Sequence, residues 1–156
     1  MAGAPALAPR TASLLLALSA ALILAAVFAF QYLGGAAPCP LCIWQRYPYG
    51  VLIALGAIGF FWQPRPVLVL SALLLLVGAG LAGYHYGIEE GWFALPAACA
   101  AGGEAGSIEE LRQMLRDAPP ACDQVRFTVF GLSLAAWNFL ASLGLAAFAG
   151  YAAVRR

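Results

Sequence analysis

Charge is scarce in this sequence, and lysine is absent from it. Only 10% of the residues are charged, whereas a soluble domain averages about 25%. The eight basic residues are all arginine, and they are scattered over a chain whose formal net charge is +1. This pattern argues against nucleic-acid binding, which usually needs a clustered basic patch. The lack of lysine disfavours chemistry that depends on a Schiff-base or P-loop lysine.

Apolar residues are correspondingly abundant. They make up 63% of the 156 residues, whereas soluble domains contain roughly half. A soluble protein of this size could not bury so much apolar surface, but a lipid bilayer removes the need to do so. The composition therefore predicts an integral membrane protein.

Four apolar stretches approach the roughly 20 residues that a membrane-spanning helix requires. Backbone amides in lipid must bond within their own segment, so each stretch is expected to form a helix. The first stretch is longer than the apolar region of a cleaved signal peptide, about 7–15 residues, and is expected to stay in the bundle. The sequence thus predicts an all-α membrane protein, a four-transmembrane-helix bundle in one domain, residues 1–156. The predicted spans are about 11–33, 43–62, 66–86 and 129–154.

The long outer loop, about 87–128, contains a helix signal of its own. Ser107 and Glu110 match a capping box, in which the serine accepts from an early backbone amide and the glutamate reaches back to the serine amide. Apolar residues then recur at helical spacing at Ile108, Leu111 and Leu115. The pattern predicts a short amphipathic helix. It lies on the membrane surface or packs on the bundle, and the sequence leaves both open.

The four cysteines fall outside the middle of the apolar stretches. Cys39 and Cys42 follow the first stretch, whereas Cys99 and Cys122 lie in the outer loop, so a four-span protein has all four on one side. Paired cysteines facing water are typical of an oxidising compartment. The arginines divide evenly between the two sides, but every acidic residue lies on the cysteine side. We therefore expect cytoplasmic termini and cysteine loops outside.

Cys39 and Cys42 form a Cys-x-x-Cys motif at the edge of the second apolar stretch. If a helix begins near Ile43, Cys42 is its cap, and the unpaired amides there carry about half a positive charge. Arg46 adds a full charge one turn further on. Both favour the thiolate, which is the form that attacks disulfides or donates electrons. The motif predicts a redox centre between water and the hydrocarbon boundary.

Other roles would produce the same motif. A static disulfide, half of a metal site or an accidental pair are alternatives. Haem attachment is disfavoured because Ile43 stands where the required histidine would follow. A zinc or soft-metal site could use all four cysteines, but Cys99 and Cys122 lie far apart, and structural zinc ligands are usually spaced more closely. We assign no metal and favour redox exchange.

His85 is the single histidine, and it lies between Tyr84 and Tyr86 at the end of the third stretch. Such a residue is usually part of the aromatic belt that anchors a membrane protein at the interface. The alternative is that His85 donates a hydrogen bond to the polar head of a bound cofactor. Gln31, near the outer end of the first stretch, has the same two interpretations.

Five segments along the chain carry a more specific signal. They are Phe30-Gln31, Cys39-Pro-Leu-Cys-Ile-Trp-Gln-Arg46, Tyr84-His-Tyr-Gly-Ile-Glu-Glu-Gly-Trp92, Cys122-Asp123 and Gly131-Leu-Ser-Leu-Ala-Ala-Trp-Asn138. Together they resemble the disulfide bond formation protein B (DsbB) family. The resemblance covers nearly the whole chain, and the order of the spans and all four cysteines agree with the family. Pro40, Trp44 and Gln45 depart from the best-known members.

The resemblance implies a quinone-linked thiol oxidase of the bacterial inner membrane. Its thiol partner would be a soluble periplasmic dithiol oxidase of the DsbA type, which the protein would reoxidise. Its electron acceptor would be ubiquinone or menaquinone. Protein disulfides would be the product, and the cysteine loops would face the periplasm.

Residue roles follow from the same resemblance. The partner would attack Cys99 to give a mixed disulfide, and the freed Cys122 would attack the Cys39–Cys42 bond at Cys39. Cys42 would be released as a thiolate against the quinone, which would be held near Arg46. Four cysteines permit three pairings. At rest we expect Cys39 with Cys42 and Cys99 with Cys122.

Three other functions are kept as alternatives. A vitamin K epoxide reductase-like enzyme would have a similar bundle but pass electrons in a different context. A four-span scaffold, broadly similar to tetraspanins, would keep its outer loop permanently stapled by disulfides and would not need Arg46. A metal-handling membrane protein would use the thiols as soft ligands.

Overall fold

The structure is a computed structural model that describes residues 8–62, 64–99, 106–109, 112–113 and 119–155. The described part is mainly helical. Its helices are α1 (Pro9–Tyr32), α2 (Pro40–Trp44), α3 (Arg46–Phe61), α4 (Pro64–Glu89) and α6 (Leu134–Val154), with a 3-10 turn, η1 (Ala97–Cys99). Two short strands, β1 (Thr128–Val129) and β2 (Leu132–Ser133), pair as an antiparallel hairpin just before α6.

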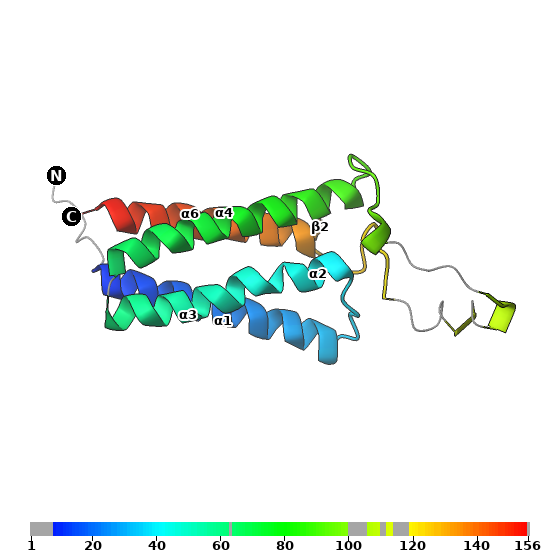
Figure 1. The fold of residues 1–156 in the computed structure, drawn as a ribbon, viewed down its shortest axis with the longest axis horizontal. Coiled ribbons are helices and arrows are strands. Elements are labelled where there is room, and N and C mark those ends of the chain that lie inside the picture. The colour runs from blue at the N-terminus through cyan, green and yellow to red at the C-terminus, as the bar shows by residue number, and fades with distance from the viewer. Residues whose placement is uncertain (1–7, 63, 100–105, 110–111, 114–118, 156) are drawn as a thin grey trace.

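The four long helices lie side by side as two pairs. α1 packs mainly against α3, and α4 packs mainly against α6 (Figure 1). α1 begins and α6 ends at one end of the bundle. α2, η1 and the hairpin gather at the opposite end, which we call the cysteine end because all four cysteines lie there (Figure 1).

Three of the described helices, α1, α4 and α6, are long and apolar enough to cross a membrane. α3 has 16 residues, fewer than the roughly 20 that a span requires. α2 precedes α3 directly, and Gln45 alone separates the two helices. The bundle therefore contains the expected four long helices, three of which have the length of a membrane span.

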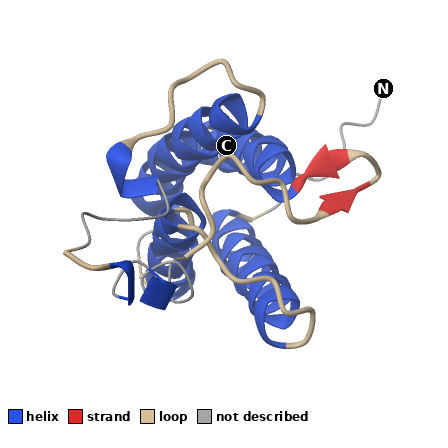
Figure 2. Ribbon diagram, turned by 90° about the vertical axis from the view of Figure 1, so that its right-hand side faces the viewer, coloured by secondary structure: helices blue, strands red, loops and turns tan. Residues whose placement is uncertain are grey.

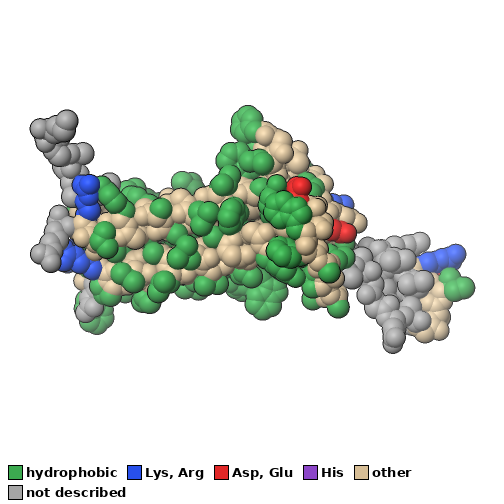
Figure 3. Space-filling model, turned by 90° about the horizontal axis from the view of Figure 1, so that it is seen from above, with side chains coloured by type: hydrophobic (Ala, Val, Ile, Leu, Met, Phe, Trp, Pro, Cys, Tyr) green, Lys and Arg blue, Asp and Glu red, His purple; other side chains and the backbone are tan. Residues whose placement is uncertain are grey.

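The outside of the bundle is apolar along most of its length. On the face seen in Figure 3, hydrophobic side chains are spread along the bundle between its ends, and charged side chains lie near the two ends. The exposed side chains include Leu22, Leu70 and Leu76. A helix bundle in water instead turns polar residues outward. Lipid is the solvent that suits this surface.

A close approach of two helix backbones joins α1 to α3. A Cβ atom added to Gly56 would lie 2.6 Å from the carbonyl oxygen of Ser13 and 2.7 Å from the Cβ of Ala17. Glycine permits the contact because small residues allow helices in lipid to approach closely. Deeper in the bundle, Leu16 and Leu52 are fully buried beside this contact.

The start of the last helix differs from the sequence prediction. α6 begins at Leu134 rather than near Val129, because residues 128–133 form the hairpin. Its two central residues, Phe130 and Gly131, have φ values of 51° and 80°. Positive φ at both positions is typical of the tight turns that join antiparallel strands. The end-on view shows the hairpin reaching outward beside the helices (Figure 2).

The predicted amphipathic helix of the outer loop falls mostly outside the described residues. Leu111 and Leu115, which define its apolar stripe, are among the residues not described. Ile108 is described and exposed. The helix therefore stays a prediction.

Candidate active site

The four cysteines form two disulfides at the cysteine end. Cys39 is bonded to Cys42 and Cys99 to Cys122, with Cα–Cα separations of 5.1 and 5.3 Å. This confirms the pairing expected at rest. Cys39, Cys99 and Cys122 are buried around Ile88, near the end of α4. The two disulfides therefore belong to one packed cluster.

Cys39, rather than Cys42, caps the helix at the start of the second apolar stretch. α2 begins at Pro40, because a proline at the first helical position loses no hydrogen bond. The Cys39 sulfur accepts a hydrogen bond from the Cys42 amide at 3.1 Å. The prediction that a helix begins near Ile43 with Cys42 as its cap is wrong. The early amides of the helix face Cys39 instead.

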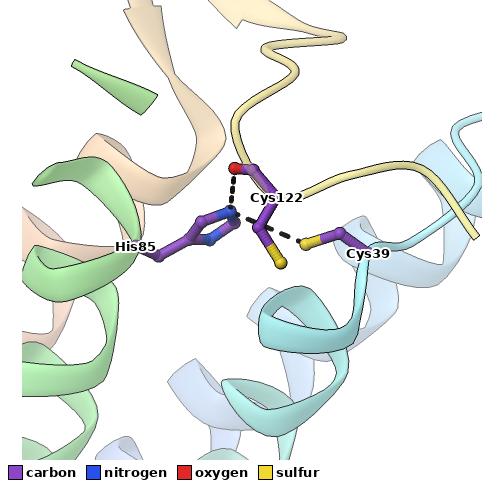
Figure 4. A group of neighbouring side chains, drawn as sticks. All are labelled: Cys39, His85 and Cys122. Atoms are coloured by element: carbon purple, nitrogen blue, oxygen red, sulfur yellow. Dashed lines mark hydrogen bonds between the residues drawn. The ribbon is translucent and has the colours of Figure 1, made fainter. Parts of the chain in front are cut away.

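His85 lies inside the cysteine cluster. Its Nε2 atom is 3.6 Å from the Cys39 sulfur and 3.2 Å from the carbonyl oxygen of Cys122 (Figure 4). The Cys39 sulfur, the Cys122 sulfur and a ring nitrogen of His85 all lie within 4.8 Å of one another. His85 is only 4% exposed, so its interpretation as part of an interfacial anchoring belt is wrong.

Cys39, His85 and Cys122 are also residue types that bind metals. Within the described part of the chain, these three lie close enough together to hold one ion. A metal requires the thiolate form of cysteine, however, and both sulfurs are bonded in disulfides. In the disulfide form, the imidazole of His85 is therefore the single ligand that this group of three residues can provide to an ion.

Arg46 begins α3, one turn after Cys42. Its Nη1 donates to Oε1 of Gln31 at 2.7 Å, and its guanidinium lies over the ring of Phe28, 5.0 Å from the ring centroid. These contacts from α1 give Gln31 a role in orienting the arginine. The Nε of Arg46 is buried and has no hydrogen-bond partner among the described residues. A buried donor without a partner is costly, so the site suits an acceptor from outside the chain.

A cavity of about 340 Å³ lies between α1 and α6 at the cysteine end. Four of the predicted site residues line it: Cys39, Cys42, Arg46 and His85. Cys99 and Cys122 pack next to Cys39 in the buried cluster. An apolar pocket with a few converging polar groups is typical of a small-molecule site. The apolar part of its wall includes Ile23, Leu24, Val27, Phe30, Phe127, Leu134, Trp137 and Ala141.

Polar side chains, most of them buried, continue from His85 into the bundle. Nε2 of Gln45 lies 2.7 Å from Nδ1 of His85, and Nδ2 of Asn138 donates to Oε1 of Gln45 at 2.5 Å. The hydroxyl of Tyr49 donates to Oδ1 of Asn138 at 2.5 Å and lies 2.8 Å from Oγ of Ser142. The sequence prediction did not include these residues in the site. Their signal was available, because polar side chains inside a membrane segment commonly mark a functional site.

Glu89 was also missed. It lies one turn after His85 on α4, and one of its carboxylate oxygens is 3.9 Å from Nε2 of His85. Its other oxygen accepts a hydrogen bond from the hydroxyl of Ser133. Ser133 caps α6 by accepting from the amide of Ala136 at 3.1 Å. Glu89 therefore connects His85 to the start of α6.

Comparison with known proteins identifies a family. The model of the disulfide bond formation protein DsbB family matches residues 9–152. Disulfide bond formation protein B of Methylococcus capsulatus is 32% identical over 149 residues, covering 89% of this chain and 90% of that protein. The protein of the same name from Dechloromonas aromatica is 31% identical over 145 residues, covering 86% of each. An uncharacterized protein of Rickettsia prowazekii is 29% identical over 142 residues, covering 87% of this chain and 79% of that protein.

No solved structure gives a significant match. The family match extends from the start of α1 into α6 and includes both disulfides. The three long apolar helices agree with a membrane protein. The chain therefore belongs to the disulfide bond formation protein B (DsbB) family.

Proposed function

We propose that this protein reoxidises a periplasmic dithiol oxidase of the DsbA type and delivers the electrons to a membrane quinone, so generating protein disulfides. One observation carries the proposal. The sulfurs of Cys39 and Cys122, which belong to different disulfides, lie within 4.8 Å of each other. A small movement would therefore allow thiol–disulfide exchange between the two pairs. A scaffold stapled by permanent disulfides has no need of this proximity.

The exchange begins at the outer-loop disulfide. A thiolate of the partner attacks the Cys99 sulfur, which forms a mixed disulfide and breaks the Cys99–Cys122 bond. Cys122 leaves as a thiolate and attacks the Cys39 sulfur. That attack forms a Cys39–Cys122 bond, breaks the Cys39–Cys42 bond and releases Cys42 as a thiolate.

Two further exchanges complete the electron transfer. The second thiol of the partner attacks the mixed disulfide, so the partner leaves oxidised and Cys99 is freed. Cys99 then attacks Cys122, which restores the Cys99–Cys122 bond and frees Cys39. Cys39 and Cys42 now hold the two electrons and two protons that the partner dithiol has lost.

Access to Cys99 requires movement. Cys99 is 3% exposed and ends the η1 turn, so a partner thiolate cannot reach its sulfur in the arrangement described above. We therefore propose that docking of the partner displaces η1.

The cavity beside Cys42 is suited to the head of a quinone. Arg46 offers a buried Nε without a partner among the described residues, and the apolar lining suits an isoprenoid tail. A bound ubiquinone or menaquinone supplies a two-electron, two-proton acceptor. Arg46 would hold its polar head, and His85 would form part of the wall beside it. The positive charge of Arg46 stabilises a Cys42 thiolate and any negative charge that develops beside it.

We assign the protein to the bacterial inner membrane with four spans. α2 and α3 together cover Pro40 to Phe61, and at about 1.5 Å per residue this length is enough for a hydrocarbon core of about 30 Å. The termini would be cytoplasmic and the cysteine end periplasmic, because disulfides persist in an oxidising compartment.

Quinone turnover tests the proposal. Purified protein, mixed with a reduced DsbA-type partner and a soluble quinone analogue, should consume one quinone for each partner dithiol, which is two partner thiols per quinone. Cys42→Ser should abolish quinone consumption, because it removes the sulfur that faces the cavity. Unchanged turnover in this variant would sink the proposal. A metal-handling protein would instead bind zinc or copper stoichiometrically when it is prepared without chelator.

A further inference from the structure

The two ring nitrogens of His85 have different kinds of neighbour. Nε2 faces three acceptors: the Cys39 sulfur at 3.6 Å, the Cys122 carbonyl oxygen at 3.2 Å and a Glu89 carboxylate oxygen at 3.9 Å. Nδ1 faces the side-chain amide nitrogen of Gln45 at 2.7 Å. An amide nitrogen only donates, so Nδ1 must accept. In the neutral ring the proton therefore lies on Nε2.

The orientation of the Gln45 amide is set by α6. Oε1 of Gln45 accepts from Nδ2 of Asn138, and Oδ1 of Asn138 accepts from the hydroxyl of Tyr49. Turning the Gln45 amide over would bring two amide nitrogens face to face. Gln45 and Tyr49 are only 7% and 3% exposed, so water is poorly able to replace a lost hydrogen bond. Each group in the series thus orients the next.

We propose that Gln45, Asn138 and Tyr49 are positioning residues that hold His85 in the tautomer with its proton on Nε2, so that it donates to the Cys39 sulfur. The three act through His85. Asn138 lies on α6, Gln45 lies between α2 and α3, and His85 lies near the end of α4. The hydrogen bonds therefore connect α6 to the disulfide cluster. This role is separate from the holding of an electron acceptor by Arg46.

The tautomer has a redox consequence at Cys39. When a dithiol reductant breaks the Cys39–Cys42 bond, it supplies two electrons and itself becomes a disulfide. A thiolate on Cys39 would then face two donors, the Cys42 amide and Nε2 of His85. Stabilising the reduced form makes a disulfide a stronger oxidant. The biological meaning of this effect rests on the proposed thiol-oxidase function, but its measurement does not.

The first test uses the single histidine as a probe. Full-length protein without a histidine tag, labelled with ¹⁵N-histidine and held in nanodiscs, gives imidazole signals from His85 alone. Pyrrole-type and pyridine-type nitrogen signals distinguish the two tautomers. We expect the proton on Nε2 in the wild type. Gln45→Glu keeps the side-chain size but replaces the donor with an acceptor, so the proton should move to Nδ1.

Two further variants control this experiment. Gln45→Met adds no charge and removes the donor, so the ring should show a weaker preference for the proton on Nε2, which only the acceptors facing Nε2 then maintain. Tyr84→Phe alters a residue of α4 next to His85. The ring of Tyr84 contacts Phe93 and not Gln45, Asn138 or Tyr49, so this variant should keep the wild-type signals.

The second test measures how easily Cys39–Cys42 is reduced. In a Cys99→Ser/Cys122→Ser background, this disulfide is equilibrated with dithiothreitol and the reduced fraction is measured by thiol alkylation. Gln45→Glu should lower the equilibrium constant for reduction about tenfold, which corresponds to about 30 mV for two electrons. Gln45→Met should lower it in the same direction without adding charge. Tyr84→Phe should match the wild type.

Three results would overturn the proposal. A wild-type ring with its proton on Nδ1 would contradict the tautomer. A Gln45→Met protein with wild-type signals would show that Gln45 does not position the ring. A changed tautomer with an unchanged equilibrium constant would show that His85 does not act on Cys39. If both tests succeed but quinone turnover is absent, the proposed function fails and this inference stands.

Discussion

The sulfur of Cys122 lies within 4.8 Å of the sulfur of Cys39, although each is bonded to a different cysteine. His85 lies between these residues, because its Nε2 contacts the Cys39 sulfur and the Cys122 carbonyl oxygen. A thiolate on Cys122 would therefore have the Cys39–Cys42 bond beside it, approached from the Cys39 side. This direction of attack is the one that releases Cys42 toward Arg46.

Cys122→Ser should trap the partner on Cys99. Without Cys122 there is no thiolate to attack Cys39, so electrons cannot pass to the second disulfide. In this variant Cys99 is left as a free thiol, which should accumulate a mixed disulfide with an oxidised DsbA-type partner. Non-reducing electrophoresis and peptide mapping would identify the bond. Partner found on Cys39 instead would reverse the assigned order of the cysteines.

Arg46→Ala should mainly weaken the use of quinone. It removes the buried donor and the positive charge beside Cys42, each of which favours an acceptor in the cavity. A lost hydrogen bond to a charged group is worth about 1.5 kcal/mol or more, so the KM for a soluble quinone analogue should rise about tenfold or more. The mixed disulfide with the partner should still form. Arg65→Ala, at the other end of the bundle, should leave the KM unchanged; an equal effect of both variants would contradict a local role.

Gly56→Val should destabilise the bundle. The added side chain would meet the backbone of Ser13, which cannot move aside by rotating a side-chain bond. Overpacking of this kind costs about 1–3 kcal/mol, so the midpoint of thermal unfolding in detergent should fall. Gly50→Ala is a control on α3 for the loss of a helical glycine, because a Cβ there has open space around it. Equal midpoints for the two variants would show that α1 and α3 do not meet as described.

Ser133→Ala should lower the free energy of unfolding by about 1–2 kcal/mol. The change removes the cap of α6 and leaves Glu89 without the hydroxyl that donates to it. Chemical denaturation in micelles would measure the loss. Ser19→Ala, on α1 and away from the hairpin, should have less effect. A fully stable Ser133→Ala protein would argue against this connection between α4 and α6.

The reduced cysteines should react from the periplasmic side. In spheroplasts treated with reductant, a membrane-impermeant maleimide added outside should label the protein at its cysteines, because the proposed topology has all four at the outer end. A cysteine introduced at Arg155, beside the end of α6, should be protected until the membrane is opened. Labelling in the opposite order would contradict the topology.

Much of the fold was predictable because its causes are local. Long apolar stretches in lipid must form helices, and this condition anticipated α1, α4 and α6. The bounds were less predictable where local turn chemistry competes with apolarity. Pro40 begins α2 ahead of the expected helix, and Gly131 allows a hairpin where the prediction continued the last span.

The site was predictable in its residue types but not in its contacts. Cys39, Cys42, Cys99, Cys122 and Arg46 carry recognisable motifs, and four of the six predicted residues line one cavity. For His85 the sequence left two interpretations open; its aromatic neighbours suggested an interfacial anchor, whereas its side chain is buried. Gln45 was noted only as a departure from the best-known members of the family, because its partner Asn138 lies 93 residues away along the chain.

By itself the sequence determined an apolar helical bundle with two cysteine pairs beyond the ends of its apolar stretches, since composition and stretch length are sufficient for both. Tertiary structure decided which sulfurs are neighbours, which nitrogen of His85 faces them and which donor on Arg46 lacks a partner in the described part of the chain. These relationships depend on α1 packing against α3 and α4 against α6. Contacts between helices join residues that are distant along the chain, and no local pattern specifies which of them will meet.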